Sequence, residues 1–170
     1  MGNGEDIRLL VAIVAPLACA GLIMAAGKRP NLREACSLVA ALVLFVAAAS
    51  LIPAVRSGDV PRLVLFRLLP GLEFALRADP LSMIFAVSAS FLWILTVFYS
   101  AGYMRGLNEH AQTRFNTCFA LTLFGAVGCA FSANLLTLYL FYEVVSVCTY
   151  PLVAHHQDDE GYSGGRKYLV

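Results

Sequence analysis

Five long apolar runs alternate with short polar segments along this chain. A helix rises about 1.5 Å per residue and a bilayer core is roughly 30 Å thick, so about 20 residues make one crossing. Residues 166–170 at the end of the sequence have the pattern of the first turn of a sixth helix. The pattern therefore predicts an all-α membrane protein with about five transmembrane helices and the start of a sixth, in a single membrane domain over residues 1–170. The expected spans are residues 9–26, 35–55, 81–102, 115–131 and 135–154.

The interval between the second and third spans has a pattern of its own. Leu63–Leu68 and Leu72–Arg77 are apolar or alternating segments on either side of Pro70-Gly71. Proline pre-sets φ for the second position of a turn, and glycine accepts the positive φ of the third. These features favour a short external β-hairpin over residues 63–77. An amphipathic helix lying at the membrane interface is the alternative interpretation.

Small and capping residues indicate how the later spans are arranged. Asp79 precedes Pro80, so that an N-cap and a first-turn proline begin the third span. Gly125 and Gly128 leave room for close helix packing in the fourth span. Only three residues separate the fourth run from the fifth, and the last of them, Asn134, is a suitable N-cap. We expect these two helices to be antiparallel neighbours.

Composition agrees with the membrane class and excludes others. Hydrophobic residues make up 59% of the chain and charged residues 14%, against about 45–50% and 25% in soluble domains. The net charge of +1 and the absence of a basic run argue against nucleic-acid binding. The five cysteines lack C-x-x-C spacing and are expected to be small apolar side chains. No nucleophile–base pair or cofactor motif is present, so we expect no cofactor and no catalysis by this chain alone.

Basic residues between the first two spans predict the orientation. The link Gly27–Glu34 contains Lys28, Arg29 and Arg33, and the positive-inside rule places such a link in the cytoplasm. We therefore expect the N-terminus outside, most simply in a bacterial inner membrane. A secretory signal would carry its positive charge before the apolar run, so the first run is expected to remain as a helix rather than be cleaved.

Glu143 is the one carboxylate inside an apolar run. On a 3.6-residue period it shares a stripe with Tyr139, Ser146 and Tyr150, and Tyr142 lies beside that stripe. A charge at mid-span costs about 3 kcal/mol on insertion scales, so such a residue indicates function by default. We expect the stripe to face the bundle interior or a water-filled half-channel. The alternative is a packing residue that is protonated or held in an ion pair.

Pro151 lies two turns after Glu143 and is expected to loosen the helix by leaving the Val147 carbonyl without its usual donor. A positive charge moving towards or away from Glu143 would change whether it holds a proton. Glu143 is thus the expected proton-translocating group. The only lysines in the sequence, Lys28 and Lys167, lie outside the apolar runs.

A titratable cluster follows the fifth span and leads into a glycine-containing segment. We expect a flexible loop at the water interface whose histidines collect protons. Metal binding by this cluster is conceivable, but no spacing defines a coordination geometry, and we expect no metal. The cluster comprises His155, His156, Asp158, Asp159 and Glu160, and the glycines are Gly161, Gly164 and Gly165.

Three stretches carry a resemblance to a known family: NLLTLYLFYEVVSVCTYPLVAHH, GGRKYLV shortly after it, and ADPLSMIF at the start of the third span. They resemble the antiporter-like membrane subunits shared by Mrp-type multisubunit cation/proton antiporters and respiratory complex I, with the D subunit of the Mrp-type antiporters the most similar. Related subunits of membrane-bound hydrogenases are also similar. The resemblance covers residues 79–170 well and the earlier part only by its layout.

The resemblance implies a subunit of about fourteen helices with two inverted five-helix repeats and an external N-terminus. It implies that Glu143 pairs with a lysine on the seventh helix. The implied partners are other membrane subunits, the lipid bilayer and H⁺, and the coupled ion is left open among Na⁺, K⁺ and H⁺ alone. This sequence ends inside the first repeat, so it is expected to be the N-terminal part of a translocating subunit. The alternative is a structural subunit or truncated remnant that only docks partner subunits.

Overall fold

The computed structural model describes residues 6–27, 29–107, 110–155 and 159–169. Helices dominate these residues, and the two strands form one antiparallel hairpin. The all-α membrane fold with a hairpin between the second and third helices is therefore confirmed. The elements are α1 (Ile7–Ala26), α2 (Pro30–Arg56), β1 (Arg62–Leu69), β2 (Leu72–Arg77), α3 (Pro80–Gly106), α4 (Gln112–Ala130), α5 (Leu135–Val153) and α6 (Asp159–Leu169).

Among the described residues, four helices are long and apolar enough to cross a membrane: α1, α2, α3 and α5. The remaining predicted span, α4, is a helix of 19 residues. It begins with Gln112, Thr113 and Arg114, which lower its mean hydropathy. Helix α4 belongs to the same bundle because it packs against the apolar helices α1 and α5.

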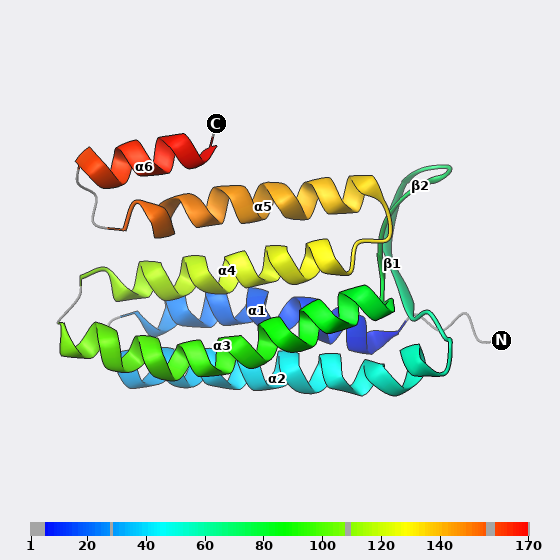
Figure 1. Cartoon of the computed structure of the whole chain (residues 1–170), viewed down its shortest axis with the longest axis horizontal. Helices are drawn as coiled ribbons and strands as arrows, with labels where there is room; N and C mark the ends of the chain where they lie inside the picture. The colour runs from blue at the N-terminus through cyan, green and yellow to red at the C-terminus, as the bar shows by residue number, and fades with distance from the viewer. Residues whose placement is uncertain (1–5, 28, 108–109, 156–158, 170) are drawn as a thin grey trace.

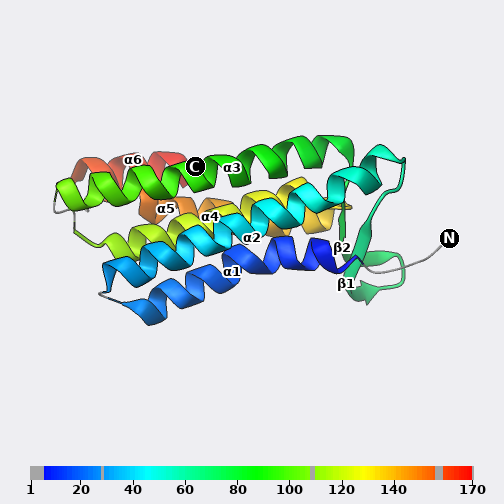
Figure 2. The ribbon, with the colours of Figure 1, turned by 90° about the horizontal axis from the view of Figure 1, so that it is seen from below.

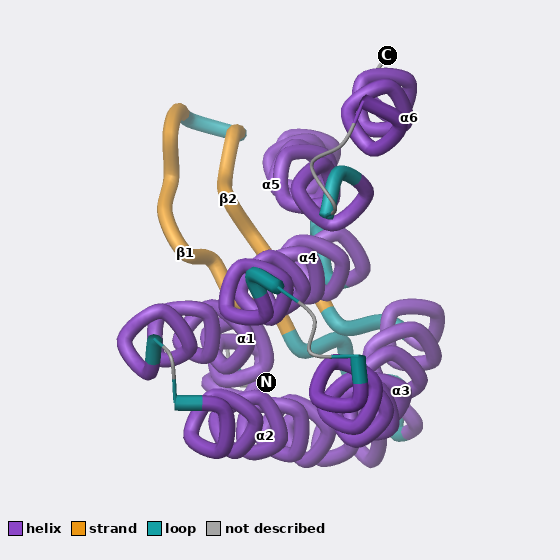
Figure 3. The backbone as a smooth tube through the Cα atoms, turned by 90° about the vertical axis from the view of Figure 1, so that its left-hand side faces the viewer, coloured by secondary structure: helices purple, strands orange, loops and turns teal. Residues whose placement is uncertain are grey.

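The five long helices run side by side, and the hairpin lies across one end of them (Figure 1). Helix α1 packs against α2 and α4, α2 packs against α3, and α5 packs against α4. Seen end-on, α5 lies outside the group formed by α1 to α4, and α6 lies outside α5 (Figure 3). Fully buried apolar side chains such as Leu9, Leu44 and Val127 fill the centre of that group. Among the four helices that are long and apolar enough to cross a membrane, α5 is therefore the least covered.

Helices α2 and α3 extend furthest beyond the spans that the apolar pattern predicts. Helix α2 begins at Pro30 and not at residue 35, because proline fits the first helical turn. Helix α3 continues to Gly106, four residues past the expected end. Hydropathy indicates where the chain leaves the apolar core of the membrane. The backbone hydrogen bonds of a helix can continue beyond that point, through polar residues. Helix α1 contains Pro16 and changes direction along its length (Figure 2), as expected for a proline inside a helix.

The predicted caps are confirmed. Asp79 accepts a hydrogen bond from the Ser82 amide at 2.8 Å, and the Ser82 hydroxyl accepts one from the Asp79 amide, also at 2.8 Å. This reciprocal arrangement is a capping box. The bond from the Ser82 amide holds the pKa of the Asp79 carboxyl below its ordinary value. Asn134 caps α5 by accepting from the Thr137 amide at 2.9 Å.

The hairpin interpretation of residues 63–77 is correct, and the interfacial helix is wrong. The strands pair from Arg62 opposite Arg77 to Leu69 opposite Leu72, and Gly71 adopts a φ of 86° in the turn. Glu73 forms ion pairs with two arginines of β1, Arg62 and Arg67, at 2.8 and 3.0 Å.

The link between α4 and α5 pairs with the outer edge of β2. The Arg77 amide donates to the Phe131 carbonyl at 2.6 Å, and the Ala133 amide donates to the Ala75 carbonyl at 3.0 Å. The Ala75 amide in turn donates to the hydroxyl of Thr137 at 3.1 Å. Because Ala75 and Thr137 are fully buried, this edge is closed to water.

We expect Thr137→Val to destabilise the full-length protein by about 1–3 kcal/mol, because the isosteric side chain leaves the buried Ala75 amide without an acceptor. Thr96→Val is the matched control, since the Thr96 hydroxyl donates only to the Leu92 carbonyl of its own helix. Thermal unfolding of the two purified variants measures the difference. Equal unfolding temperatures would show that the Thr137 bond contributes nothing to stability.

The glycine-containing segment after α5 is a helix and not a flexible loop. Helix α6 begins at Asp159 and includes all three glycines. A Cβ added at Gly165 would lie 2.8 Å from Cε2 of Tyr150, and one added at Gly164 would lie 3.8 Å from Cγ1 of Val153. Gly165 thus allows close packing of α6 on Tyr150 of α5, and composition alone does not distinguish such a glycine from one in a flexible loop.

Candidate functional site

Glu143 lies at the middle of α5. It is the ninth of the 19 residues from Leu135 to Val153, which places it about 12 Å from the start of the helix at a rise of 1.5 Å per residue. Its side chain is exposed. No lysine or arginine in the described part of the chain forms an ion pair with it.

Close packing on α4 determines which face of α5 is free. A Cβ added at Gly128 would clash with the ring of Phe141, and one added at Gly125 would lie 2.7 Å from Cγ2 of Val145. The two glycines of α4 therefore receive the Phe141 and Val145 face of α5, as the small-residue pattern predicts. Glu143 points away from this contact, and its face is opposite to the one the helix buries.

The predicted polar stripe is covered at one end only. Tyr139 is 59% exposed, and Tyr142 beside the stripe is 60% exposed, whereas Ser146 and Tyr150 are half-buried. The Tyr139 hydroxyl interacts with Glu143 one turn further along the helix. Tyr150 lies under α6, against Gly165. Within the described residues the stripe thus faces the side of α5 on which α6 begins a further layer (Figure 1), and does not face the interior of the α1–α4 group.

This arrangement restricts what can lie against the free face. A charged carboxylate at this depth would cost about 3 kcal/mol against lipid, and backbone or side-chain polar groups there need partners. An ionised Glu143 therefore needs protein or water against it in a membrane. Pro151 lies inside α5, which continues to Val153. Its missing amide leaves the Val147 carbonyl free to accept a bond from water on the same helix.

His155 packs at the end of the bundle opposite to the hairpin. Its ring stacks on His110 at 5.1 Å between centroids and meets Phe115 edge-on at 5.6 Å. The Arg114 guanidinium donates to the His155 carbonyl at 2.7 Å. His155 is therefore a partly covered side chain between α4 and α5, more enclosed than the water-facing loop that the sequence suggests. His156 lies outside the described residues, and proton collection by this pair stays a prediction.

Arg33 is a buried charge that the apolar pattern does not reveal. The sequence suggests a polar link at this position, but Arg33 lies in the first turn of α2 and is only 4% exposed. Its guanidinium donates to Gln112 at 2.6 Å and to Thr113 at 3.3 Å, both at the start of α4. Nearby, Arg105 of α3 pairs with Glu34 at 2.7 Å. These contacts tie α2, α3 and α4 together at this end and leave Glu143 apart from them.

No group of three or more histidine, cysteine, aspartate or glutamate side chains that could hold a metal ion occurs within the described ranges. The five cysteines are free thiols, and of them only Cys19 is buried. Glu143, with hydroxyl groups nearby on the same helix, carries a carboxyl group that can bind and release a proton.

Comparisons with known proteins agree with this membrane architecture. A family model described as NADH-Ubiquinone oxidoreductase (complex I), chain 5 N-terminus, matches residues 71–116. That segment covers β2, α3 and the first turn of α4, and Glu143 lies beyond it. The match therefore bears on the scaffold that precedes the candidate site.

Relatives are NAD(P)H-quinone oxidoreductase subunit 5 proteins of chloroplasts. Those of Carthamus tinctorius, Anthoceros angustus and Manihot esculenta are 33%, 34% and 35% identical to this chain over 82 residues. The matched part is 48% of this chain and 11% of each relative. The chain thus spans only a small part of the length of these relatives.

A similar fold occurs in the structure of the membrane-bound sulfane sulfur reductase, an archaeal respiratory membrane complex. The TM-score is 0.78 at 19% identity, over 95% of this chain and 24% of that chain. The comparisons thus show that part of this chain is similar to subunit 5 of NAD(P)H-quinone oxidoreductases, and that its fold also occurs in a subunit of a respiratory membrane complex.

Proposed function

We propose that this chain forms part of a membrane subunit that translocates protons or monovalent cations, with Glu143 as its proton-exchanging carboxylate. The observation that carries this proposal is the position of Glu143: mid-span on α5, exposed, and on the face opposite to the packed Phe141 face. A carboxylate so placed is expensive in lipid and indicates function.

A cation that pairs with Glu143 would come from outside this sequence. Both of its lysines lie beyond the apolar runs, and no described arginine reaches Glu143. The matched relatives are many times longer than the segment they share with this chain. A lysine on a later helix of the same subunit, brought against the exposed face, would change the proton affinity of the carboxylate.

Coupling would then follow from charge movement. When such a lysine approaches Glu143, the ionised carboxylate is favoured and a proton leaves; when the lysine withdraws, a proton is taken up. Tyr139 interacts with the carboxylate, and the half-buried Ser146 and Tyr150 extend a line of hydroxyls from it towards the His155 end of α5. That line offers successive hydrogen-bond partners for water and protons.

The host assembly is part of the same proposal. Other membrane subunits of a complex I-like or Mrp-type antiporter assembly would be its partners, with the lipid bilayer around them and H⁺, Na⁺ or K⁺ as the transported ions. The chain would lie in a bacterial inner membrane with its N-terminus outside, since three basic residues follow the first span.

A carbodiimide experiment tests the function without changing the sequence. Dicyclohexylcarbodiimide partitions into membranes and reacts with protonated carboxyl groups. We expect it to label the peptide that contains Glu143 in the full-length protein within its complex, and proton movement into vesicles to fall in step with that label. Complexes that carry the label on Glu143 but move protons at the unlabelled rate would contradict the proposal and favour a purely structural subunit.

A further inference from the structure

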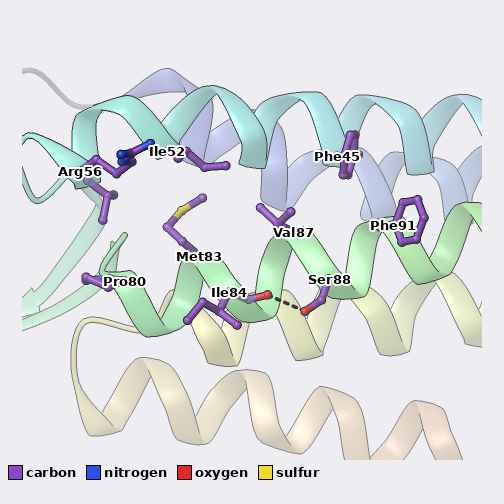
Figure 4. Close-up of a pocket in the computed structure, with 10 residues that line it drawn as sticks. Phe45, Ile52, Arg56, Pro80, Met83, Ile84, Val87, Ser88 and Phe91 are labelled. Atoms are coloured by element: carbon purple, nitrogen blue, oxygen red, sulfur yellow. Dashed lines mark hydrogen bonds between the residues drawn. The ribbon is translucent and has the colours of Figure 1, made fainter.

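Helices α2 and α3 lie on the opposite side of the bundle from α5 and α6 (Figure 3). An apolar groove runs between them (Figure 4). Its volume is about 630 Å³. It opens sideways, because Ile84 and Phe91 on its rim are 70% and 50% exposed. The lining residues are Phe45, Ile52, Val55, Arg56, Pro80, Met83, Ile84, Val87, Ser88 and Phe91.

The groove has no polar group available to a ligand along its length. Ser88 is the one hydroxyl in the lining, and it already donates to the carbonyl of Ile84 in its own helix. A polar small molecule would therefore lose its hydration without gaining hydrogen bonds. The chemistry of the lining selects a hydrocarbon chain.

The length of the groove matches one leaflet of a bilayer. It extends along α2 from Phe45 to Arg56 and along α3 from Pro80 to Phe91 (Figure 4). Eleven residues at 1.5 Å per residue give about 16 Å, close to half of a hydrocarbon core of roughly 30 Å. A single acyl chain of a phospholipid would fill this length with its headgroup at the hairpin end.

Arg56 lies at that end, where α2 stops. Its side chain is exposed and forms no hydrogen bond or ion pair with any described residue. The neighbouring arginines of the hairpin differ, because Arg62 and Arg67 pair with Glu73 and Arg77 pairs with Asp79. A guanidinium binds a phosphate through paired charge-assisted hydrogen bonds. The uncompensated charge thus sits where a lipid phosphate would be.

We propose that the α2–α3 groove binds one anionic phospholipid, with an acyl chain between Phe45 and Phe91 and the phosphate on Arg56. Charge and length both point to this occupant. A helix of a partner subunit would also bury apolar surface, but it would not need a free cation at the mouth of the groove. This inference does not depend on Glu143 or on ion transport.

Photo-crosslinking in vesicles tests the proposal on the full-length protein in its complex. The vesicles consist of phosphatidylethanolamine with a few per cent of phosphatidylglycerol that carries a diazirine on one acyl chain. Illumination is expected to label α2 and α3 residues that line the groove. Arg56→Gln should lower this labelling about tenfold, the size expected for loss of a charge-assisted contact. Arg67→Gln removes the same charge from the same end of the bundle, at a side chain that is 76% exposed, and should leave labelling within twofold of wild type.

A second variant tests binding of the lipid's acyl chain rather than of its headgroup. Ser88→Leu adds apolar volume inside the groove and should also reduce labelling, while proton movement by the complex stays unchanged. Equal labelling by a phosphatidylethanolamine probe, or full labelling of Arg56→Gln, would overturn the choice of an anionic lipid. If the lipid probe labels no groove residue, and groove residues are instead found crosslinked to another subunit, the groove binds a protein partner and not a lipid.

Discussion

Replacing Glu143 by glutamine is expected to reduce proton movement through the full-length subunit in its complex by about a hundredfold, the size typical of losing a positioned proton-transfer group. Glutamine keeps the shape of the side chain and a polar group beside Tyr139, but it cannot release a proton. The variant should assemble normally, because Glu143 is exposed and makes no packing contact with α4. Dye-reported acidification of vesicles measures the rate.

Two companion variants separate the carboxylate from its surroundings. Glu143→Asp keeps the proton-binding group on a shorter side chain and should retain a measurable part of the rate. Tyr142→Phe alters a neighbouring side chain that is 60% exposed but not on the Glu143 stripe, and should move protons like the wild type. A Glu143→Gln complex with a near wild-type rate would remove Glu143 from the transport path and leave it a structural residue.

The largest effect on assembly is expected for Gly128→Val. The new side chain would occupy the space of the Phe141 ring, and overpacking of this kind costs about 1–3 kcal/mol or more in tightly packed interiors. Helix α5 contacts the other long helices mainly through α4. A shift at Phe141 would therefore move the face of α5 that carries Glu143. We expect little assembled complex in the membrane, as measured by the yield of purified full-length protein and by its thermal stability.

Gly21→Val is the matched control for that experiment. Gly21 is also a helical glycine within an apolar helix, but a Cβ added there meets no atom within 4 Å. Its yield should equal that of the wild type. If Gly128→Val assembles as well as Gly21→Val, then α5 can move away from α4 without loss, and the position of the Glu143 face is not fixed by this contact.

Much of the scaffold follows from local patterns. Pro70-Gly71 between two apolar segments predicts the hairpin, and Asp79 and Asn134 predict the starts of α3 and α5, because turns and caps depend on residues a few positions apart. The close approach of α4 and α5 follows from Gly125 and Gly128 in the same way. Each of these signals lies within one stretch of sequence.

The features that the sequence did not reveal depend on distant partners. Arg33 reads as part of a basic link until Gln112 and Thr113, about 80 positions later, enclose it. The glycines of the last segment suggest a loop, but the segment is a helix in which Gly165 makes room for the ring of Tyr150, 15 positions earlier. Periodicity places Glu143 on a polar stripe, but only the packing of Phe141 shows that this stripe lies on the free side of α5.

The pairing of β2 with the α4–α5 link has a consequence for the order of biosynthesis. Arg77 and Ala75 leave the ribosome more than 50 residues before Phe131 and Ala133, which complete their hydrogen bonds. Until then the nascent hairpin has an open edge of the kind that recruits foreign strands. The edge of β2 is therefore paired only when α5, the helix that carries Glu143, begins to emerge. A chain halted within α4 would contain its first helices, but the edge of β2 would still lack its hydrogen-bond partners.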